Sequence, residues 1–355
     1  MTPQSPQPQS FDRVLSSMCT RPAPAAERAA HEFLATNPGD PATFETIADL
    51  ESKVVSQLGE VVGLSDPSGY VTAGGTEANI QAVRAARNQA QTDSPNVVAP
   101  ESAHFSLQKA AGLLDVELRE VETTANHRAD PEKMAATADE DTVLVFCVAG
   151  STEYGRVDPI PELAELAAGV GANCHVDAAF GGFLLPFTDH DWNFRHAAID
   201  TMTIDPHKAG RAAIPAGGFL ARDHSILDAL SIETPYLASD SQITLGGTRS
   251  GAGVASAHAA YESLWPDGYR ASFERTMELA NWFESALSDR GYEVAEPSLP
   301  LVTWEPEPGE FEALRDAGWQ IARTGSGAIR VVVMPHVTRA MLSEFVGDID
   351  ALSDR

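Results

Sequence analysis

TMTIDPHKAG, at residues 201–210, contains the lysine of this chain whose neighbours are best arranged for chemistry. The alternation in IDTMTI predicts a strand, and the residues around Lys208 (Asp-Pro-His before it, Ala-Gly after it) predict a turn at the strand's carboxyl end. Open α/β sheets bind their ligands at this edge. Lysine also forms Schiff bases with carbonyl compounds, so Lys208 is a candidate nucleophile. The alternative is an ordinary structural lysine.

The other three lysines have unremarkable surroundings. Lys53 and Lys109 lie in segments whose apolar residues recur at helical spacing, which predicts positions on helix surfaces. Lys133 lies in an acidic segment marked by a proline, which predicts a solvated loop or helix start. Chemistry is therefore expected at Lys208 and not at these three positions.

The composition predicts an acidic globular protein. Its 355 residues, 43% of them hydrophobic, suffice for two domains or for one large α/β domain with an appendage. With 51 acidic and 24 basic residues the formal charge is -27, so nucleic acids and anionic membrane surfaces are not expected partners. The acidic residues are spread along the chain, which is typical of a halophilic protein's solvated surface and less so of an acidic binding face.

No targeting or membrane segment is expected. Cys19, Cys147 and Cys174 form no C-x-x-C pair, which argues against a zinc ribbon or a disulfide framework. The first ten residues are a polar Pro/Gln tract without the apolar core of a signal peptide, and no later run is long enough to span a membrane. We therefore expect a cytoplasmic protein.

Strands and helices alternate through the middle of the chain. Predicted strands lie in PNVVAPE, VELREVE, TVLVFCVAG, NCHVDA, IDTMTI and PAGGFLA. This alternation predicts an α/β fold with a mostly parallel, doubly wound sheet. Near the N-terminus, FDRVLSSM predicts a short helix, and the prolines after it predict an extended path that lies outside the core.

Beyond residue 252 the pattern changes. Two long helices, short strands at YEVAE, LVTWEP and AIRVVVM, and a closing helix predict a smaller C-terminal α+β domain. The predicted division is therefore an N-terminal segment at 1–48, a large domain at 49–251 and a small domain at 252–355.

Four features fall at the carboxyl ends of successive sheet elements. Gly75 and Thr76 form a Gly-rich turn into a helix, whose N-terminus attracts phosphate. The other three features are His104, Asp177 and Lys208 with its neighbour His207. Together they supply what holds pyridoxal 5'-phosphate (PLP): a phosphate cradle, an aromatic ring, a carboxylate for the pyridine nitrogen and a lysine for the aldehyde. Helix capping by Thr76 and by Asp177 is the structural alternative.

Eight motifs resemble one known family. In chain order they are SSMCTRPAPAA, TAGGTEAN, ESAHFS, HVDAAFGGF, TIDPHKAG, ETPYL, GTRSGA and RVVVMPHVT. They resemble the archaeal tyrosine/aspartate decarboxylases, a branch of the group II PLP-dependent amino-acid decarboxylases, from Leu15 to Val337. The resemblance implies the aspartate-aminotransferase-like fold type I of PLP-dependent transferases. It also implies a homodimer with active sites at the subunit interface.

The resemblance assigns roles to individual residues. Lys208 would bind the cofactor's aldehyde, His104 would stack on its ring, and Asp177 would pair with the pyridine nitrogen. The other cofactor-binding positions would be Gly75, Thr76 and His207 for the phosphate, Thr152 near the ring hydroxyl and Ala179 beneath the ring. Tyr236 falls where related decarboxylases have a mobile-loop tyrosine that protonates Cα after CO₂ leaves. Arg330 is a candidate for substrate recognition, and no metal is expected.

The expected substrate is L-aspartate, which would give β-alanine for coenzyme A biosynthesis. The family's substrates include tyrosine, aspartate and glutamate, and the motifs are common to all. Aspartate is favoured because an acidic, lysine-poor chain resembles haloarchaeal proteins, and a halophile needs β-alanine but is not expected to need tyramine. Two departures, PAPAA for a His-Pro pair and HKAGR for HKMG, leave the pocket wall near Ala209 and Arg211 open.

Three other functions remain alternatives. Another PLP lyase, resembling cysteine desulfurases or phosphosphingosine lyases, would keep Lys208 and Asp177, although a desulfurase needs a loop cysteine that this chain lacks. A non-catalytic scaffold of the same fold is the second. A metal hydrolase on His175 and Asp177 is the third, but no third ligand follows at suitable spacing, and a satisfied core histidine is the better interpretation.

Overall fold

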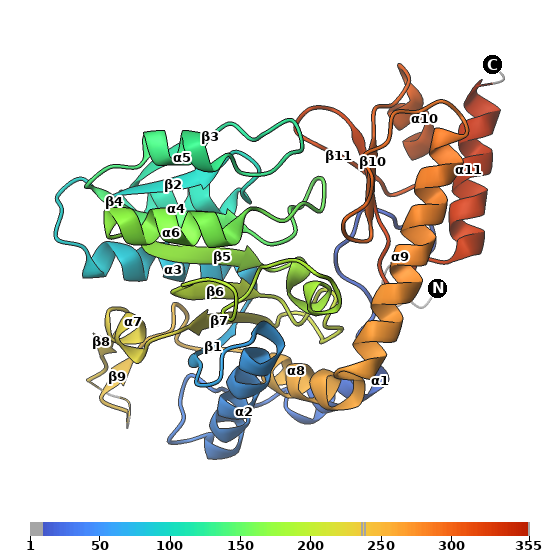
Figure 1. The fold of residues 1–355 in the computed structure, drawn as a ribbon. Coiled ribbons are helices and arrows are strands. Elements are labelled where there is room, and N and C mark those ends of the chain that lie inside the picture. Colours follow the sequence, from blue (N-terminus) through green and yellow to red (C-terminus); the bar gives the residue numbers. More distant parts are fainter. Residues whose placement is uncertain (1–9, 236, 238, 354–355) are drawn as a thin grey trace, which may run out of the picture.

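A seven-stranded sheet forms the centre of the larger part of the molecule in the computed structural model, which describes residues 10–235, 237 and 239–353 (Figure 1). Its strands are β1 (Ser68–Thr72), β2 (Asn96–Pro100), β3 (Glu117–Val121), β4 (Thr142–Val148), β5 (Asn173–Ala178), β6 (Thr201–Ile204) and β7 (Gly217–Ala221). The strand order is β1-β7-β6-β5-β4-β2-β3. The pairs from β3 to β6 are parallel, and β7 runs antiparallel to both of its neighbours. This confirms the predicted mostly parallel sheet.

Helices cover both faces of this sheet, and they are α2 (Glu45–Val62), α3 (Gly75–Gln89), α4 (Ser106–Leu114), α5 (Pro131–Thr137), α6 (Ile160–Val170) and α7 (His224–Asp228). Strand β4 explains the need for two helix layers, because its apolar side chains are buried on both faces of the sheet. Leu144 and Phe146 pack with residues of α3 and α4, whereas Val145 and Cys147 pack with residues of α6. A strand buried on both faces needs a helix layer on each.

The C-terminal part has its own sheet and core. Its elements are α8 (Gly251–Leu264), α9 (Asp267–Ser288), β10 (Leu301–Trp304), α10 (Glu310–Asp316), β11 (Ala322–Arg323), β12 (Ile329–Val332) and α11 (Arg339–Ser353). The antiparallel order is β10-β12-β11, and Figure 1 shows α9 beside α11 over this sheet. Phe283, Trp304 and Phe345 form the centre of its core, with ring centroids 5.6 to 6.2 Å apart. The predicted strand at YEVAE is wrong, since only Val294 forms a bridge there, to Trp304.

Helix α8 does not pack in the core of the C-terminal part, although it follows the large sheet's last strands in the sequence. Its Val254, Ala255 and Ala257 belong to the core under the large sheet, whereas the apolar residues of α9 from Leu279 onward belong to the C-terminal core. The division of the chain at residues 48 and 251 stays a prediction.

The N-terminal segment differs from the expectation. Residues 11–18 form no helix; Val14 bridges Gln320, and Leu15 is fully buried in the C-terminal core. The second of the two prolines then begins a helix, α1 (Pro24–Glu32), which packs on α8. Proline is tolerated in the first turn of a helix because the N–H that it lacks has no intrahelical partner there. This segment therefore contributes to both cores.

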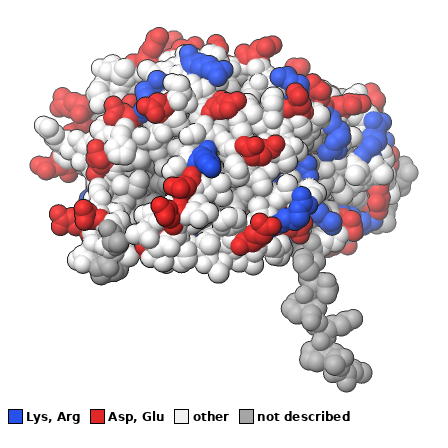
Figure 2. Space-filling model, turned by 90° about the horizontal axis from the view of Figure 1, so that it is seen from below, with Lys and Arg blue, Asp and Glu red and all other residues white. Residues whose placement is uncertain are grey.

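Acidic side chains are not gathered into one patch on the face of the molecule that Figure 2 presents. Figure 2 shows Asp and Glu side chains scattered over the face in view, with Lys and Arg side chains between them. Among the described residues, no helix is both long and apolar enough to cross a membrane. A short antiparallel pair, β8 (Ile232–Glu233) and β9 (Ser241–Gln242), flanks the segment that contains Tyr236, which lies outside the described residues.

Candidate active site

A cavity of about 640 Å³ opens at the carboxyl ends of β4, β5 and β6, and we call it the cofactor cavity. Eight of the predicted site residues line it: Gly75, Thr76, His104, Thr152, Asp177, Ala179, His207 and Lys208. Arg330 is not among its lining residues, and Tyr236 lies outside the described part of the chain. The fold thus brings together residues spread over more than a hundred positions of sequence.

The turn before α3 forms one wall of the cofactor cavity. Gly74 has a positive φ of 152°, and a Cβ on it would lie 3.1 Å from the His207 ring. A Cβ on Gly75 would lie 3.1 Å from the Cβ of Ala179 and 3.2 Å from a carboxylate oxygen of Asp205. Glycine therefore lets the start of α3 approach the ends of β5 and β6 closely. Gly74, not Thr76, is the N-cap, so the alternative of a plain capping role for Thr76 is wrong.

Asp177 is held from two sides at the end of β5. One carboxylate oxygen accepts a hydrogen bond from the Asn79 amide at 2.7 Å, and the other accepts from the Ala179 backbone N–H at 3.0 Å. The helix that follows begins at Gly181 with Phe180 as its N-cap and has no side-chain cap, so the alternative that Asp177 caps it is wrong. Only 7% of Asp177 is exposed, so this carboxylate is fixed and almost dry. Such a group suits the pyridine nitrogen of a bound cofactor.

A buried polar network supports Asp177 from behind. The Asn79 carbonyl oxygen accepts from the Thr203 hydroxyl at 2.7 Å and lies 3.1 Å from Nε2 of His175. His175 is fully buried, and its Nδ1 lies 2.8 Å from the Thr201 hydroxyl. Burial lowers the pKa of His175 to about 4, although Asp177 opposes the shift. His175 is thus the satisfied core histidine of the sequence-based interpretation. Among the described residues, no group of three or more His, Cys, Asp or Glu could hold a metal ion.

Lys208 extends from the turn after β6 toward a carboxylate. Its Nζ lies 3.0 Å from one oxygen of Asp205, whose other oxygen is buried without a partner among the described residues. Burial alone would lower the pKa of Lys208, but the charges of Asp205 and Asp177 outweigh it and raise this pKa. Without a ligand, Lys208 is therefore an ammonium group held in place.

The two cavity histidines are neutral at neutral pH. Burial is the largest cause that lowers the pKa of His104 and the pKa of His207. Nδ1 of His104 accepts from the Ser106 backbone N–H at 3.2 Å, and Nδ1 of His207 accepts from that of Ala216 at 3.2 Å. Each ring therefore carries its proton on Nε2. A neutral, oriented imidazole suits stacking at His104 and hydrogen-bond donation at His207.

Arg330 contacts a residue that lines the cofactor cavity without lining it itself. Its guanidinium donates to the backbone carbonyl oxygens of Thr152 at 2.6 Å and Ser16 at 3.0 Å. It thereby ties the segment after β4 to the C-terminal sheet and to the N-terminal segment.

Sequence reasoning missed two residues of this site. Asp205 precedes Lys208 by three positions in the same turn, and a carboxylate at that spacing beside a candidate nucleophile was an available signal. Asn79 lies three residues after Thr76 in α3 and is 1% exposed. A polar residue among the apolar positions of a buried helix could have indicated it.

The residues present fit PLP. A lysine side chain, a buried fixed carboxylate, a neutral imidazole and a glycine-lined helix start surround one cavity, as the cofactor's aldehyde, ring nitrogen, ring face and phosphate require. Solved structures agree with this class of fold. The model superposes on a Burkholderia pseudomallei sphingosine-1-phosphate lyase with a TM-score of 0.89 at 20% identity, over 97% of this chain and 86% of that one. It superposes on a Lactobacillus brevis glutamate decarboxylase with a TM-score of 0.87 at 21% identity, over 98% of this chain and 89% of that one. These matches confirm the predicted fold.

The sequence narrows this class. The model of the pyridoxal-dependent decarboxylase conserved domain matches residues 35–305, and the chain belongs to this PLP-dependent family. The "Probable L-aspartate decarboxylase" of Halobacterium salinarum is 64% identical over 98% of both chains. The protein of the same name from Haloarcula marismortui is 62% identical over 98% of this chain and 99% of its own. A "Probable L-tyrosine/L-aspartate decarboxylase" of Methanothrix thermoacetophila is 45% identical over 96% of this chain and 90% of its own.

Proposed function

We propose that this chain removes the α-carboxylate of L-aspartate, giving β-alanine and CO₂. One observation carries the proposal: Lys208 and the buried Asp177 line one cavity in a chain that is 64% identical to a protein named a probable L-aspartate decarboxylase. The β-alanine would enter coenzyme A biosynthesis, in the cytoplasm of a halophilic archaeon.

The proposed roles follow the chemistry of each side chain. Lys208 would hold the aldehyde of PLP, and Asp177 would keep the pyridine nitrogen protonated. Bound PLP supplies an electron sink for the electrons left on Cα when CO₂ departs. His104 would stack on the ring. The other proposed contacts are Gly75, Thr76 and His207 to the phosphate, Thr152 near the ring hydroxyl and Ala179 beneath the ring.

Asp205 has a supporting role in this proposal. Its carboxylate lies 3.0 Å from the Lys208 amine, so it would restrict where that amine points before the aldehyde arrives. Because Lys208 must lose a proton to react as a nucleophile, Asp205 is also a neighbouring group that can receive one.

Two residues would act on the substrate. Tyr236 would donate the proton that Cα needs once CO₂ has left. Arg330 would meet a substrate carboxylate through the N–H groups that its bonds to the Thr152 and Ser16 carbonyls leave available.

A homodimer is part of the proposal. Phe105 and Leu245 line the cofactor cavity yet are 59% and 49% exposed. Large apolar side chains at the mouth of a cavity favour cover by another protein surface, and a second copy of this chain would provide it.

Tyrosine and glutamate are the alternative substrates. Relatives at 45% and 41% identity carry names that include both L-tyrosine and L-aspartate, and a glutamate decarboxylase shares the fold. The test is CO₂ release by the PLP-loaded protein from L-aspartate, L-tyrosine, L-glutamate and a panel of other amino acids, with the amine product identified. We expect L-aspartate to have the highest kcat/KM. A higher value for tyrosine or glutamate would replace the proposed substrate, and no CO₂ from any of them would refute decarboxylation.

A further inference from the structure

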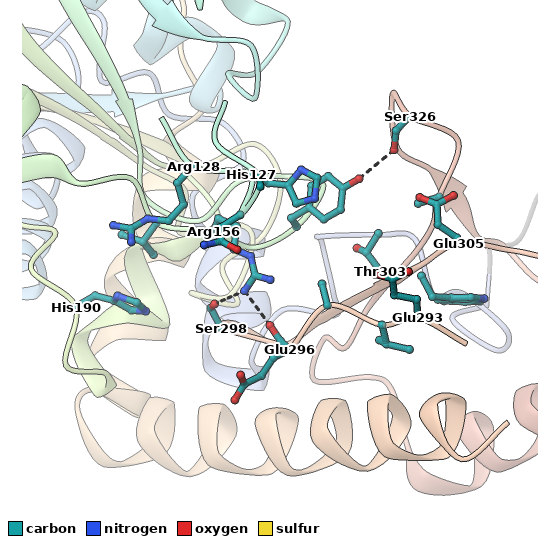
Figure 3. A pocket seen from close by; sticks show the side chains of 18 residues that line it. His127, Arg128, Arg156, His190, Glu293, Glu296, Ser298, Thr303, Glu305 and Ser326 are labelled. Atoms are coloured by element: carbon teal, nitrogen blue, oxygen red, sulfur yellow. Dashed lines mark hydrogen bonds between the residues drawn. The ribbon is translucent and has the colours of Figure 1, made fainter. Parts of the chain in front are cut away.

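A second cavity, of about 680 Å³, lies between the large sheet's loops and the C-terminal sheet (Figure 3), and we call it the interdomain cavity. One side comes from residues 125–128 and 154–157 and from His190, and the other from residues 293–298 and 303–305. None of its lining residues lines the cofactor cavity. The proposed decarboxylation therefore leaves it without a role.

Basic side chains gather on one side of the interdomain cavity, where Glu296 lies beside Arg156, and two further glutamates lie across from them. The basic residues are His127, Arg128, Arg156 and His190, and Figure 3 shows Glu293 and Glu305 across from them. Because burial lowers the pKa of His127 and of His190, the positive charge on this side is that of Arg128 and Arg156. Its field attracts small anions.

A tight turn presents the basic residues. His127 has a φ of 56°, which is uncommon for a residue other than glycine, and its N–H donates to the Thr124 carbonyl at 2.8 Å. The His127 ring stacks on Tyr154 at 3.6 Å with only 3° between the planes. Tyr154 in turn lies 3.0 Å from the Ser326 hydroxyl of the C-terminal part. The turn is therefore fixed next to the cavity.

Both arginines of the interdomain cavity have N–H groups available. The Arg128 side chain is exposed and has no hydrogen bond or ion pair with any described residue. Arg156 donates through Nη1 to the Glu296 carbonyl at 2.8 Å and to the Ser298 hydroxyl at 2.7 Å, while its Nε is buried without a described partner. Neutral acceptors thus position Arg156 without neutralising it. Arginine binds carboxylates through such free N–H groups.

The positive charges also destabilise one another. Burial lowers the pKa of Arg156, Glu296 raises it, and the charge of Arg128 lowers it further. Burial and then Arg128 lower the pKa of His190 as well. An anion placed against Arg128 and Arg156 would relieve this repulsion.

The opposite wall restricts the charge of the ligand. Glu293 and Glu305 would repel the second charge of a dianion and would attract an ammonium group. We propose that the interdomain cavity binds a small amino acid, with its carboxylate against Arg128 and Arg156 and its ammonium toward Glu293 and Glu305. This site is separate from the cofactor cavity and does not rest on the identity of the decarboxylated substrate.

Calorimetric titration of the PLP-loaded protein with γ-aminobutyrate and with butyrate, at one ionic strength, tests the site. The two probes share a carboxylate and a chain length, and only the first has an ammonium group. We expect saturable binding of γ-aminobutyrate with a lower Kd than butyrate. Losing a hydrogen bond between charged groups should raise that Kd about tenfold or more in Arg128→Gln and in Arg156→Gln.

Two controls keep the result interpretable. Arg87→Gln removes an exposed arginine outside both cavities and should leave the Kd unchanged. The Arg128 side chain has no hydrogen-bond or ion-pair partner among the described residues, so a retained melting temperature in Arg128→Gln separates lost binding from lost structure. No saturable binding, or the same Kd in the parent and both cavity variants, would overturn the site. Equal Kd values for the two probes would overturn the ammonium contact with the glutamates.

Discussion

The two cavities of this protein hold their charged groups in opposite ways. In the cofactor cavity both oxygens of Asp177 accept hydrogen bonds from the protein, and the Lys208 amine lies against Asp205. In the interdomain cavity the Arg128 side chain has no hydrogen-bond or ion-pair partner among the described residues, and Arg156 is held by neutral acceptors. The first arrangement fixes geometry before a ligand arrives, as catalysis by positioned charges requires, whereas the second leaves charge for a ligand to neutralise.

The largest expected effect is at the lysine of the cofactor cavity. Lys208→Ala should abolish decarboxylation and the visible absorbance of lysine-bound PLP, because no other lysine lines this cavity. Circular dichroism should show a retained fold. Lys53→Ala and Lys133→Ala remove exposed lysines and are the matched controls. If a control variant loses the chromophore instead, the wrong cavity has been assigned to the cofactor.

Asp177→Asn sharpens the claim that the cofactor cavity fixes charge. The amide keeps the size of the side chain but cannot hold a pyridine nitrogen protonated, so kcat should fall about a hundredfold or more while PLP still binds. Cofactor content and kcat of the purified variant are the measurements. Turnover near that of the parent would contradict the electron-sink role of Asp177.

Tyr236→Phe should change which products form, while PLP still binds. If Tyr236 donates the proton to Cα, its loss should lower amine formation from L-aspartate and raise carbonyl by-products. Product analysis and the melting temperature distinguish this role from a structural one, which would lower the melting temperature without changing the products. Parent-level β-alanine without by-products would exclude Tyr236 as the donor.

The last effect is on stability and not on activity, and it concerns the support behind Asp177. The pKa of His175 is about 4 in the folded protein against an ordinary value of 6.5, so the unfolded chain binds more protons between these values. The contribution of His175 to the free energy of unfolding is therefore fully present above pH 6.5. It decreases by about 1.4 kcal/mol per pH unit as the pH falls from 6.5 toward 4.

His175→Gln should remove this pH slope from the free energy of unfolding, measured by urea unfolding at a series of pH values. Asp158, whose pKa burial raises to about 6, gives a slope of opposite sign, but it is present in both proteins and cancels in their difference. An identical pH dependence in parent and variant would mean that His175 is not a buried neutral group.

The comparison of the cavities also shows what sequence alone could predict. The residues of the cofactor cavity follow strands of one parallel sheet, and carboxyl ends of parallel strands meet at one edge, so motif and periodicity sufficed. Asn79 and Asp205 were missed because their roles depend on the carboxylate and amine that they face across the fold. The interdomain cavity could not be predicted, because Arg128, Arg156 and His190 meet only through the packing of loops.

The errors in the fold have a similar cause. Residues 11–18 are compatible with a helix locally, but Leu15 gains more by burial in the C-terminal core, where the Val332 N–H donates to its carbonyl at 2.7 Å. Strand β1 was missed because Gly69 interrupts its pattern. A Cβ on Gly69 would lie 2.1 Å from the Phe219 carbonyl oxygen, so glycine is what lets β1 pair with β7.

Borohydride reduction of the PLP-loaded protein, followed by peptide mass mapping, tests the central claim most directly. Reduction makes the lysine–cofactor bond permanent, so the modified residue identifies the site without any assay of activity. The account predicts a pyridoxyl group on the peptide that contains Lys208 and on no other. A modification at Lys53, Lys109 or Lys133, or no modification in protein that has bound PLP, would contradict it.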